Sequence, residues 1–316
     1  MFVDFWSGFE VRNNYFLRFL EQHFDVVIDP SPDYLFYSVY GFSHLKYDNC
    51  IKILYTGENI VPDFNLCDYA LGFHYLNFDD RYMRLPLYVI YPDYENLQKP
   101  KPYNMEKLFN RKFCNFVYSN NTNAEPTRSL FFEALTKYKK VDSGGRFLNN
   151  IGGPVVDKRG FIRDYKFSIA FENSVCPGYT TEKIMEPMLE HSMPVYYGNP
   201  LVHLDFNSES FVIIKDANSF NEAIEEIIVL DQNNDKYLEK LSKQSVVPEN
   251  NSLRWEKEML IFFDNIFRQP LHLAKRKPGF GYNKFRTWEC TVQADLFVKY
   301  KKRNKIKANI KSFFGR

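Results

Sequence analysis

The sequence predicts an α/β protein built from two parallel-sheet domains. Short apolar runs typical of strands alternate with helix-like segments, and the alternation occurs twice, before and after a polar, proline-containing stretch at 91–104. Such alternation is typical of parallel sheets flanked by helices. At 316 residues, the chain is also longer than one hydrophobic core usually serves. We therefore expect two Rossmann-like domains that face a central cleft.

The expected first domain covers residues 1–104 and has one clear helix among short strands. Residues 14–24 place Phe16, Phe19, Leu20 and Phe24 at helical spacing. Apolar runs that end in turn residues predict the strands. They are MFVDFW (1–6), DVVIDP (25–30), YLFYSVYG (34–41), CIKILYTGEN (50–59), DYALGF (68–73) and MRLPLYVI (83–90). The stretch 91–104 is the expected linker.

The expected second domain, residues 105–270, repeats the alternation. Its strands are predicted at KFCNFVYSN (112–120), YKFSIAFEN (165–173), MPVYYGN (193–199) and FVIIKD (211–216). Its helices are predicted at 124–138, 180–192 and 219–231. The first helix is expected to bury Leu130, Ala134, Leu135 and Tyr138. In the third, Ser219 and Glu222 have capping-box spacing.

The C-terminal segment, 271–316, ends in a strongly basic tail. Residues 299–316 hold eight Lys or Arg and no acid, which leaves 33 basic against 39 acidic residues elsewhere. Ile306, Ile310, Phe313 and Phe314 have helical spacing among the basic residues. This pattern predicts a basic amphipathic helix for an anionic membrane surface, with a solvated basic end as the alternative. The mildly acidic body argues against a nucleic-acid binder.

Several classes of site are disfavoured by missing motifs. Neither a P-loop nor a complete dinucleotide fingerprint is present, and the histidines lack zinc-binding spacing. There is no G-x-S-x-G elbow and no Asp-x-Asp triplet. The five scattered cysteines favour a reducing compartment over a disulfide framework. No apolar run is long enough to span a membrane, and the N-terminus does not resemble a signal peptide.

The stretch FENSVCPGYTTEKI (171–184) carries the most chemistry. It follows a predicted strand, where parallel sheets present ligands, and it opens a predicted helix. Thr180 is a plausible N-cap, and the helix N-terminus with Lys183 favours an anion such as a diphosphate. The alternative is that Glu182 and Lys183 are ordinary charges in the first turn of a solvated helix. Pro187 is expected to kink that helix.

The same residues carry a resemblance to a known family. The segments FENS, GYTTEKI and PVYYGNP resemble the donor-binding motif of bacterial α1,3-fucosyltransferases of glycosyltransferase family 10. The segments KFCNFVYSN and VDSGG, and in the first half LYTGENIVPDFNLCDYALGF and RYMRLPLY, are similar too. The resemblance spans most of residues 50–230. It implies a GT-B fold, with an acceptor-side domain followed by a donor-side domain.

The resemblance also implies an activity. The family transfers L-fucose from GDP-β-L-fucose to a GlcNAc hydroxyl of a galactose-containing acceptor, with inversion at the anomeric carbon and a Lewis x-type product. Two alternatives stay open: a GT-B transferase that uses another GDP-sugar such as GDP-mannose, and a non-catalytic glycan-binding module. The choice between α1,3 and α1,4 linkage, the natural acceptor and the oligomeric state are not decided by the sequence.

Two carboxylates are implied as catalytic. Glu58, in the YTGENI segment after an apolar strand, matches the family's proposed general base. Glu182 matches a carboxylate near the fucose, where it would steady a cationic transition state or bind sugar hydroxyls. The residues alone favour a plain loop carboxylate in a Gly-Glu-Asn turn, and it is the resemblance that favours catalysis.

The implied donor-binding residues lie in the second half. Arg128 and Lys183 match the cations on the diphosphate, and Arg128 is otherwise a solvated helical arginine. Tyr179 and Asn173 match donor residues, whereas Glu172 has a donor-side or a structural role. Gly144 and Gly145 either admit backbone close to the nucleotide or form a plain turn. Tyr197 is expected near the guanine–ribose side of the pocket.

The expected partners follow from these assignments. They are GDP-fucose, a galactose- and GlcNAc-containing glycan, and an anionic membrane surface contacted by residues 299–316. No metal site and no required cofactor are expected, and stimulation by Mn²⁺ stays open. The enzyme is expected in the cytoplasm, peripheral to the inner face of the membrane, near lipid-linked glycans such as lipopolysaccharide O-antigen. The region before the tail lacks the heptad repeats that similar bacterial members often carry.

Overall fold

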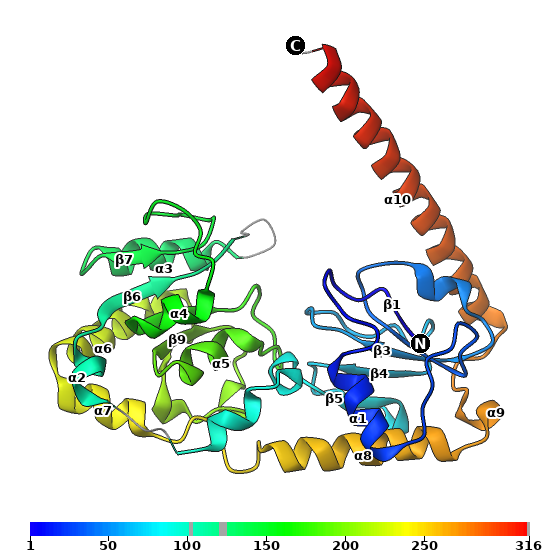
Figure 1. Cartoon of the computed structure of the whole chain (residues 1–316), viewed down its shortest axis with the longest axis horizontal. Coiled ribbons are helices and arrows are strands. Elements are labelled where there is room, and N and C mark those ends of the chain that lie inside the picture. The colour runs from blue at the N-terminus through cyan, green and yellow to red at the C-terminus, as the bar shows by residue number, and fades with distance from the viewer. Residues whose placement is uncertain (101–103, 120–124, 315–316) are drawn as a thin grey trace. The chain divides into compact units, whose positions relative to one another are not determined.

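The computed structural model describes residues 1–100, 104–119 and 125–314, and it divides into two compact units (Figure 1). The first unit comprises Met1–Gly72, Leu76–Met83 and Leu260–Arg316, and the second comprises Phe73–Tyr75 and Arg84–Met259. The structure thus groups residues 84–104 with the second unit and 271–316 with the first. These groups differ from the expected domains 1–104, 105–270 and 271–316.

A five-stranded sheet forms the core of the first unit. Its strands lie in sequence order: β1 (Phe2–Val3), β2 (Tyr34–Tyr37), β3 (Ile51–Tyr55), β4 (Tyr69–Gly72) and β5 (Tyr82–Arg84). The pairs from β1 to β4 are parallel. Helix α1 (Tyr15–His23) buries Phe16, Phe19 and Leu20 as predicted, and the Asn14 side chain caps it by accepting from the Leu17 amide at 2.9 Å.

Two strand predictions in this half need correction. Residues 25–30 (DVVIDP) form no strand, and the Val27 side chain is 82% exposed. The two sheets of the described residues contain no strand that pairs with this run, and a strand-like composition without a partner ladder does not make a strand. The run predicted at 83–90 is a strand only as far as Arg84. Pro86, whose ring fixes φ, then leads into a 3₁₀ helix, η3 (Leu87–Ile90).

The expected linker is partly structured. Within the described part of 91–104, residues Tyr94–Gln98 form a 3₁₀ helix, η4, in which Tyr94 and Leu97 are buried. The Tyr94 hydroxyl donates to the Asn250 carbonyl at 2.5 Å. The remaining 3₁₀ helices are η1 (Ser43–Lys46), η2 (Asp79–Arg81), η5 (Val202–Leu204), η6 (Ser208–Ser210) and η7 (Ala217–Ser219).

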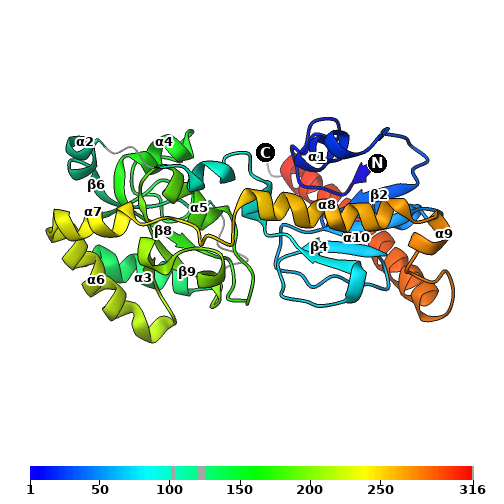
Figure 2. The same ribbon diagram turned by 90° about the horizontal axis from the view of Figure 1, so that it is seen from below.

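The second unit is built on a parallel five-stranded sheet of the doubly wound kind. Its order is β7 (Val141–Ser143), β6 (Lys112–Phe116), β8 (Tyr165–Phe171), β9 (Met193–Tyr197) and β10 (Val212–Ile213), and all pairs are parallel. Helices α4 (Lys158–Arg163) and α5 (Glu182–Leu189) cover one face (Figure 2). Helices α3 (Thr127–Thr136) and α6 (Phe220–Gln232) cover the other. The strand order reverses between β6 and β8, which is where such sheets bind ligands.

Details of two helices differ from the prediction. Helix α3 buries Arg128, Phe131, Phe132 and Leu135, while Leu130 is 54% exposed. Helical periodicity allows α3 to bury either the face that contains Leu130 or the face that contains the two phenylalanines. The larger Phe131 and Phe132 rings are the ones that fill the core. The capping box lies three residues earlier than expected. Asp216 is the N-cap of η7, and Ser219 occupies the third helical position of that box. Ser219 therefore does not form a capping box with Glu222.

The remaining helices are α2 (Met105–Phe109), α7 (Asn234–Ser242), α8 (Ser252–Arg268), α9 (Leu271–Ala274) and α10 (Gly281–Phe314). The last of these contains the predicted tail helix but begins well before it, as the long red helix of Figure 1 shows. In the part of the chain that the structure describes, no helix is both long and apolar enough to span a membrane.

Candidate functional site

A pocket of about 220 Å³ lies at the point where the second sheet reverses its strand order. Residues of β6 and β8, and residues that follow these strands, form its floor, and α4 and α5 contribute one wall. Three cationic side chains line it: Arg128, Lys158 and Lys183. The one acidic side chain among its lining residues, Glu186, forms an ion pair with Lys158. This excess of positive charge suits an anionic ligand.

Arg128 is buried instead of solvated, with 2% of its surface exposed. Its Nη2 donates to the carbonyls of Phe171 and Glu172, each at 3.2 Å, and to Asn173 Oδ1 at 3.0 Å. Its guanidinium also lies 3.9 Å from the centre of the Tyr118 ring. Arg128 thus holds the chain that leaves β8 and places a full charge on the pocket wall.

The start of α5 is capped from within the protein. Thr181, not the predicted Thr180, is the N-cap. The Glu172 carboxylate accepts from the Thr181 amide at 2.7 Å and from its hydroxyl at 2.8 Å. The Glu172 side chain thus folds back from the end of β8 to hold the N-cap residue, while the Thr181 hydroxyl itself accepts from the Lys183 amide at 3.4 Å.

Glu172 also compensates the charge of Lys183. The Lys183 ammonium lies 3.2 Å from Glu172 Oε2, and their side chains are 15% and 0% exposed. Burial raises the pKa of Glu172, against the opposing effect of Lys183. Burial alone would lower the pKa of Lys183, but the Glu172 and Glu182 carboxylates raise it. Lys183 therefore stays protonated at neutral pH, and Glu172 orients it toward the pocket.

Glu182 and Asn173 differ in how far other protein groups hold their side chains in place. Glu182 is the first residue of α5 and is partly exposed. Among the described residues, no hydrogen bond or ion pair engages its carboxylate, so it is available to a ligand. Asn173 is fixed by Arg128 through its side chain, while its carbonyl accepts from the Glu125 amide at 3.2 Å.

Tyr179 belongs to a tightly held turn just before α5. Its side chain is 2% exposed, and its ring packs edge-on against Phe73 with centroids 4.8 Å apart. Gly178 has φ +90°, and a Cβ there would lie 2.3 Å from the Phe73 carbonyl oxygen. Only glycine satisfies both the dihedral angle and the space at this position of the turn.

The glycine pair and Tyr197 contact protein neighbours. A Cβ on Gly145 would lie 1.8 Å from the Tyr118 carbonyl oxygen, and one on Gly144 would meet the Phe161 ring at 2.8 Å. The close approach that these glycines permit is therefore to this chain's own residues. The Tyr197 ring packs on Phe171, with centroids 5.3 Å apart. Gly144, Gly145 and Tyr197 themselves do not line the 220 Å³ pocket.

Glu58 lies in the first unit, in the loop that follows β3. The Thr56 hydroxyl accepts from the Glu58 amide at 3.0 Å and lies 3.1 Å from the Glu58 carbonyl, so the turn is locally fixed. The Tyr40 hydroxyl donates to Glu58 Oε1 at 2.8 Å. The carboxylate is thus oriented by one hydrogen bond and is only partly buried, as a group that meets a substrate must be.

Two pocket residues were missed by the sequence reasoning. Lys158 begins α4, and the approach of that helix to α5 gives it its place beside Glu186. Tyr118 supports Arg128, and its hydroxyl accepts from the Phe171 amide at 2.6 Å. Tyr118 lies in a segment that the resemblance singled out, whereas Lys158 had no local signal. Within the described residues, no group of three or more His, Cys, Asp or Glu could hold a metal ion.

Comparisons with known proteins give matches over both halves of the chain. Residues 1–91 match the family model described as the N-terminal domain of α-(1,3)-fucosyltransferase FucT. Residues 108–265 match the C-terminal model of glycosyltransferase family 10 (fucosyltransferase). The chain is 36% identical over 280 residues to α-(1,3)-fucosyltransferase FucT of Helicobacter pylori, and 26% identical over 246 residues to α-(1,3)-fucosyltransferase B of Drosophila melanogaster. The alignments cover 76% and 71% of this chain but only 58% and 53% of those proteins.

Solved structures give the same result. A crystal structure of an α1,3-fucosyltransferase with GDP-fucose matches with a TM-score of 0.68 and 33% identity, over 82% of this chain and 86% of that one. Another α1,3-fucosyltransferase structure matches with a TM-score of 0.74 and 30% identity, over 88% and 91%. These matches confirm the predicted fold class. From its family models, its relatives and its two parallel five-stranded sheets, the chain belongs to glycosyltransferase family 10, the fucosyltransferases.

Proposed function

We propose that this chain is an inverting α1,3-fucosyltransferase that uses GDP-β-L-fucose. The observation that carries the proposal is the pocket at the β6–β8 reversal, where buried Arg128 and Lys183 present positive charge. Family membership and the likeness to a structure with GDP-fucose support the choice of donor. The acceptor is a GlcNAc hydroxyl of an N-acetyllactosamine-type glycan, and the product is of the Lewis x type.

The proposed reaction is one displacement at the anomeric carbon. Glu58 takes the proton from the acceptor hydroxyl as its oxygen bonds to C1 of fucose. The bond from C1 to the diphosphate oxygen breaks, and GDP leaves with the electron pair. Arg128 and Lys183 stabilise the charge that develops on the diphosphate, and Glu182 steadies the positive charge on the sugar. Because these cations stabilise the negative charge on the leaving group, the proposed reaction has no requirement for a metal, and stimulation by Mn²⁺ is a separate test.

Product analysis tests the proposed function. The purified protein is incubated with GDP-fucose and either a type 1 or a type 2 chain disaccharide, and NMR assigns the new linkage. We expect acceptor-dependent GDP release and an α1,3-linked fucose on the type 2 acceptor. Parallel reactions contain GDP-mannose. Turnover with GDP-mannose alone would identify a different transferase, and glycan binding without GDP release would identify a binding module.

The basic tail supports a second part of the proposal, attachment to the inner face of a membrane. The described side chains at the start of the tail, including Lys301, Lys302 and Arg303, are exposed. Helix α10 also exposes a row of apolar residues at helical spacing that leads into the tail. These are Tyr282, Phe285, Trp288, Val292, Leu296 and Tyr300. Basic charge and exposed aromatic rings on one helix suit the surface of an anionic bilayer.

Replacing Lys301, Lys302 and Arg303 by Gln is expected to weaken vesicle binding roughly 100-fold, because each basic residue near an anionic surface contributes about 1 kcal/mol. Co-sedimentation with vesicles of phosphatidylcholine, with and without phosphatidylglycerol, measures the effect. The control replaces Lys215, Lys236 and Lys257, which are exposed in the second unit. Equal binding of the wild type to neutral and anionic vesicles would contradict the proposal.

A further inference from the structure

The segment RYMRLPLY (81–88) resembles the family sequence, yet the proposed reaction gives it no role. Within it, Arg84 ends β5 and its side chain is only 12% exposed. Its guanidinium forms a bidentate pair with Asp205, with Nη1 at 2.9 Å from Oδ1 and Nη2 at 2.6 Å from Oδ2. The Asp205 side chain is 2% exposed. Burying both charges carries a desolvation cost, so this pair by itself is weak evidence for stability.

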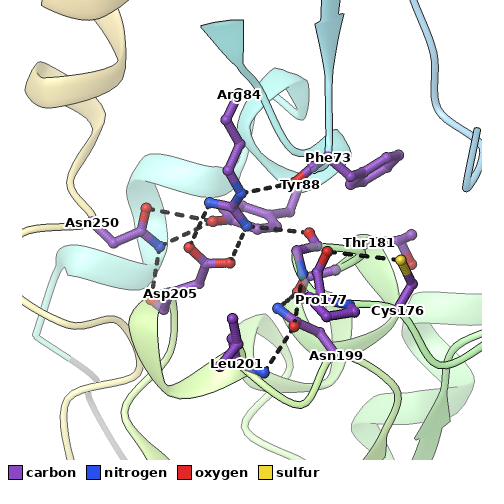
Figure 3. Close-up of polar contacts among 12 residues, drawn as sticks. Phe73, Arg84, Tyr88, Cys176, Pro177, Thr181, Asn199, Leu201, Asp205 and Asn250 are labelled. Atoms are coloured by element: carbon purple, nitrogen blue, oxygen red, sulfur yellow. Dashed lines mark hydrogen bonds and ion pairs between the residues drawn. The ribbon is translucent and has the colours of Figure 1, made fainter. Parts of the chain in front are cut away.

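The other donors of Arg84 are directed at backbone near the candidate site. Nε donates to the Phe73 carbonyl at 2.9 Å, and Nη2 donates to the Gly178 carbonyl at 3.2 Å. Figure 3 shows the guanidinium between Asp205 and the turn that contains Pro177. One planar side chain therefore fixes two separate stretches of backbone. A fork of five N–H donors makes this possible, and a lysine ammonium could not reproduce it.

The same turn is held from its other side by Asn199. Asn199 Oδ1 accepts from the Gly178 amide at 2.8 Å, and its Nδ2 donates to the Thr180 hydroxyl at 2.9 Å (Figure 3). Both polar groups of the Gly178 backbone are thus engaged by buried side chains. Together with the φ of +90°, these contacts determine the path of residues 177–180.

Tyr179 is connected to both residues whose carbonyls Arg84 holds. It directly follows Gly178, and its ring packs edge-on against the Phe73 ring. A shift of either the Phe73 or the Gly178 carbonyl would therefore move the Tyr179 side chain.

Asp205 is itself fixed. Its carbonyl accepts from Asn250 Nδ2 at 2.7 Å, and Asn250 Oδ1 accepts from the Trp255 indole at 2.7 Å. The Arg84 guanidinium thus pairs with a residue that is itself held by buried hydrogen bonds, and it has little freedom to reorient.

We propose that Arg84, oriented by Asp205, is a positioning residue that holds the Gly178–Tyr179 turn in the shape that the donor sugar-nucleotide requires. Arg84 acts through the Phe73 and Gly178 carbonyls and does not touch the donor. This inference rests on the proposed donor role of Tyr179. It gives the RYMRLPLY segment a function in the second unit, where Arg84, Phe73 and Gly178 all lie.

Matched substitutions at two buried ion pairs test this inference. Asp205→Asn and Arg84→Lys weaken the Arg84 pair. The control, Asp231→Asn, weakens the Lys166–Asp231 pair, whose side chains are 5% and 6% exposed and which lies by the start of β8. Melting temperatures report the structural cost of each change. Arg84→Lys keeps the charge and serves as the milder variant if Asp205→Asn folds poorly.

Amide hydrogen exchange of a peptide that spans residues 174–184 reports the turn directly. In Arg84→Lys and Asp205→Asn we expect exchange at least about 10-fold faster than in wild type, and in Asp231→Asn no change. For GDP-fucose, kcat/KM should fall roughly 10- to 100-fold in the first two variants, with the acceptor KM unchanged, because a small misplacement at a reacting site is costly. Combining Arg84→Lys with Tyr179→Phe should add little further loss if Arg84 acts through Tyr179.

The outcomes separate this inference from the proposed function. Unchanged amide exchange in both Arg84→Lys and Asp205→Asn would show that Arg84 does not hold the Gly178–Tyr179 turn. Faster exchange with wild-type donor kinetics would overturn the positioning role, as would equal kinetic losses in Asp231→Asn. If the wild-type protein fails to turn over GDP-fucose, the proposed function fails, and with it the positioning role. The exchange data would still decide whether Arg84 holds the turn.

Discussion

Replacing Glu58 by Gln is expected to abolish fucosyl transfer while leaving GDP affinity near the wild-type value. The amide of Gln cannot take the acceptor proton, and loss of a general base typically lowers turnover roughly 10²- to 10⁴-fold. The loop should keep its shape. The contacts of the Glu58 backbone with Thr56 do not involve the carboxylate, and the amide oxygen of Gln can still accept from Tyr40. The change therefore removes proton transfer with little change in structure.

Initial rates of GDP release and calorimetry with GDP measure the two quantities. Glu10→Gln is a matched control, because Glu10 is a carboxylate of the same unit that also accepts one side-chain hydrogen bond, from Asn13 at 3.3 Å. Near-normal turnover in Glu58→Gln would remove Glu58 from the role of base. A large drop in GDP affinity in the same variant would instead indicate that the loop contributes to donor binding.

Most of the secondary structure followed from apolar periodicity, and two of the exceptions share a physical cause. Residues 25–30 have strand-like composition but pair with no strand of the two described sheets. Helix α3 has apolar residues at 130, 131 and 132, so periodicity alone allowed two buried faces. In both cases the result depends on tertiary neighbours, which a local pattern does not contain.

In the candidate site too, local sequence predicted some features and missed those that depend on tertiary contacts. Local sequence placed Glu172, Tyr179, Glu182 and Lys183 together at a strand-to-helix junction, and the structure has them there. It did not indicate that the Glu172 carboxylate turns back to accept from the Thr181 amide and to pair with Lys183. Contacts between segments that are distant in the sequence could not be predicted from local patterns at all. Arg84 and Asp205 are 121 residues apart, and no spacing rule connects them.

Removing either pocket cation is expected to weaken GDP binding and to lower turnover further. For Lys183→Ala and Arg128→Ala we expect GDP affinity to fall roughly 10- to 100-fold, the range for a hydrogen bond to a charged group. Turnover should fall by at least a further factor of about 10, because the charge on departing GDP is greatest in the transition state. Calorimetry and initial rates measure the two effects. Unchanged GDP affinity in both variants would contradict the diphosphate assignment.

Both cations also have structural contacts, so stability must be separated from ligand binding. Arg128 holds three oxygen atoms at the end of β8, and Lys183 neutralises buried Glu172. Lys166→Ala is the matched control, since Lys166 is a buried lysine paired with Asp231. It should lower the melting temperature without changing GDP affinity. An equal loss of GDP affinity in this control would show that the measured effect comes from general destabilisation.

The double variant Glu172→Gln with Lys183→Ala completes the test. Lys183→Ala alone leaves a buried carboxylate without its ion-pair partner, which is costly, whereas the neutral Gln removes that penalty and keeps the side-chain volume. We expect the double variant to recover much of the lost stability but none of the lost GDP affinity. Recovery of both stability and GDP affinity would mean that Lys183 has only a structural role. Recovery of stability alone would assign the Lys183 charge to the ligand, with Glu172 as the group that holds it in place.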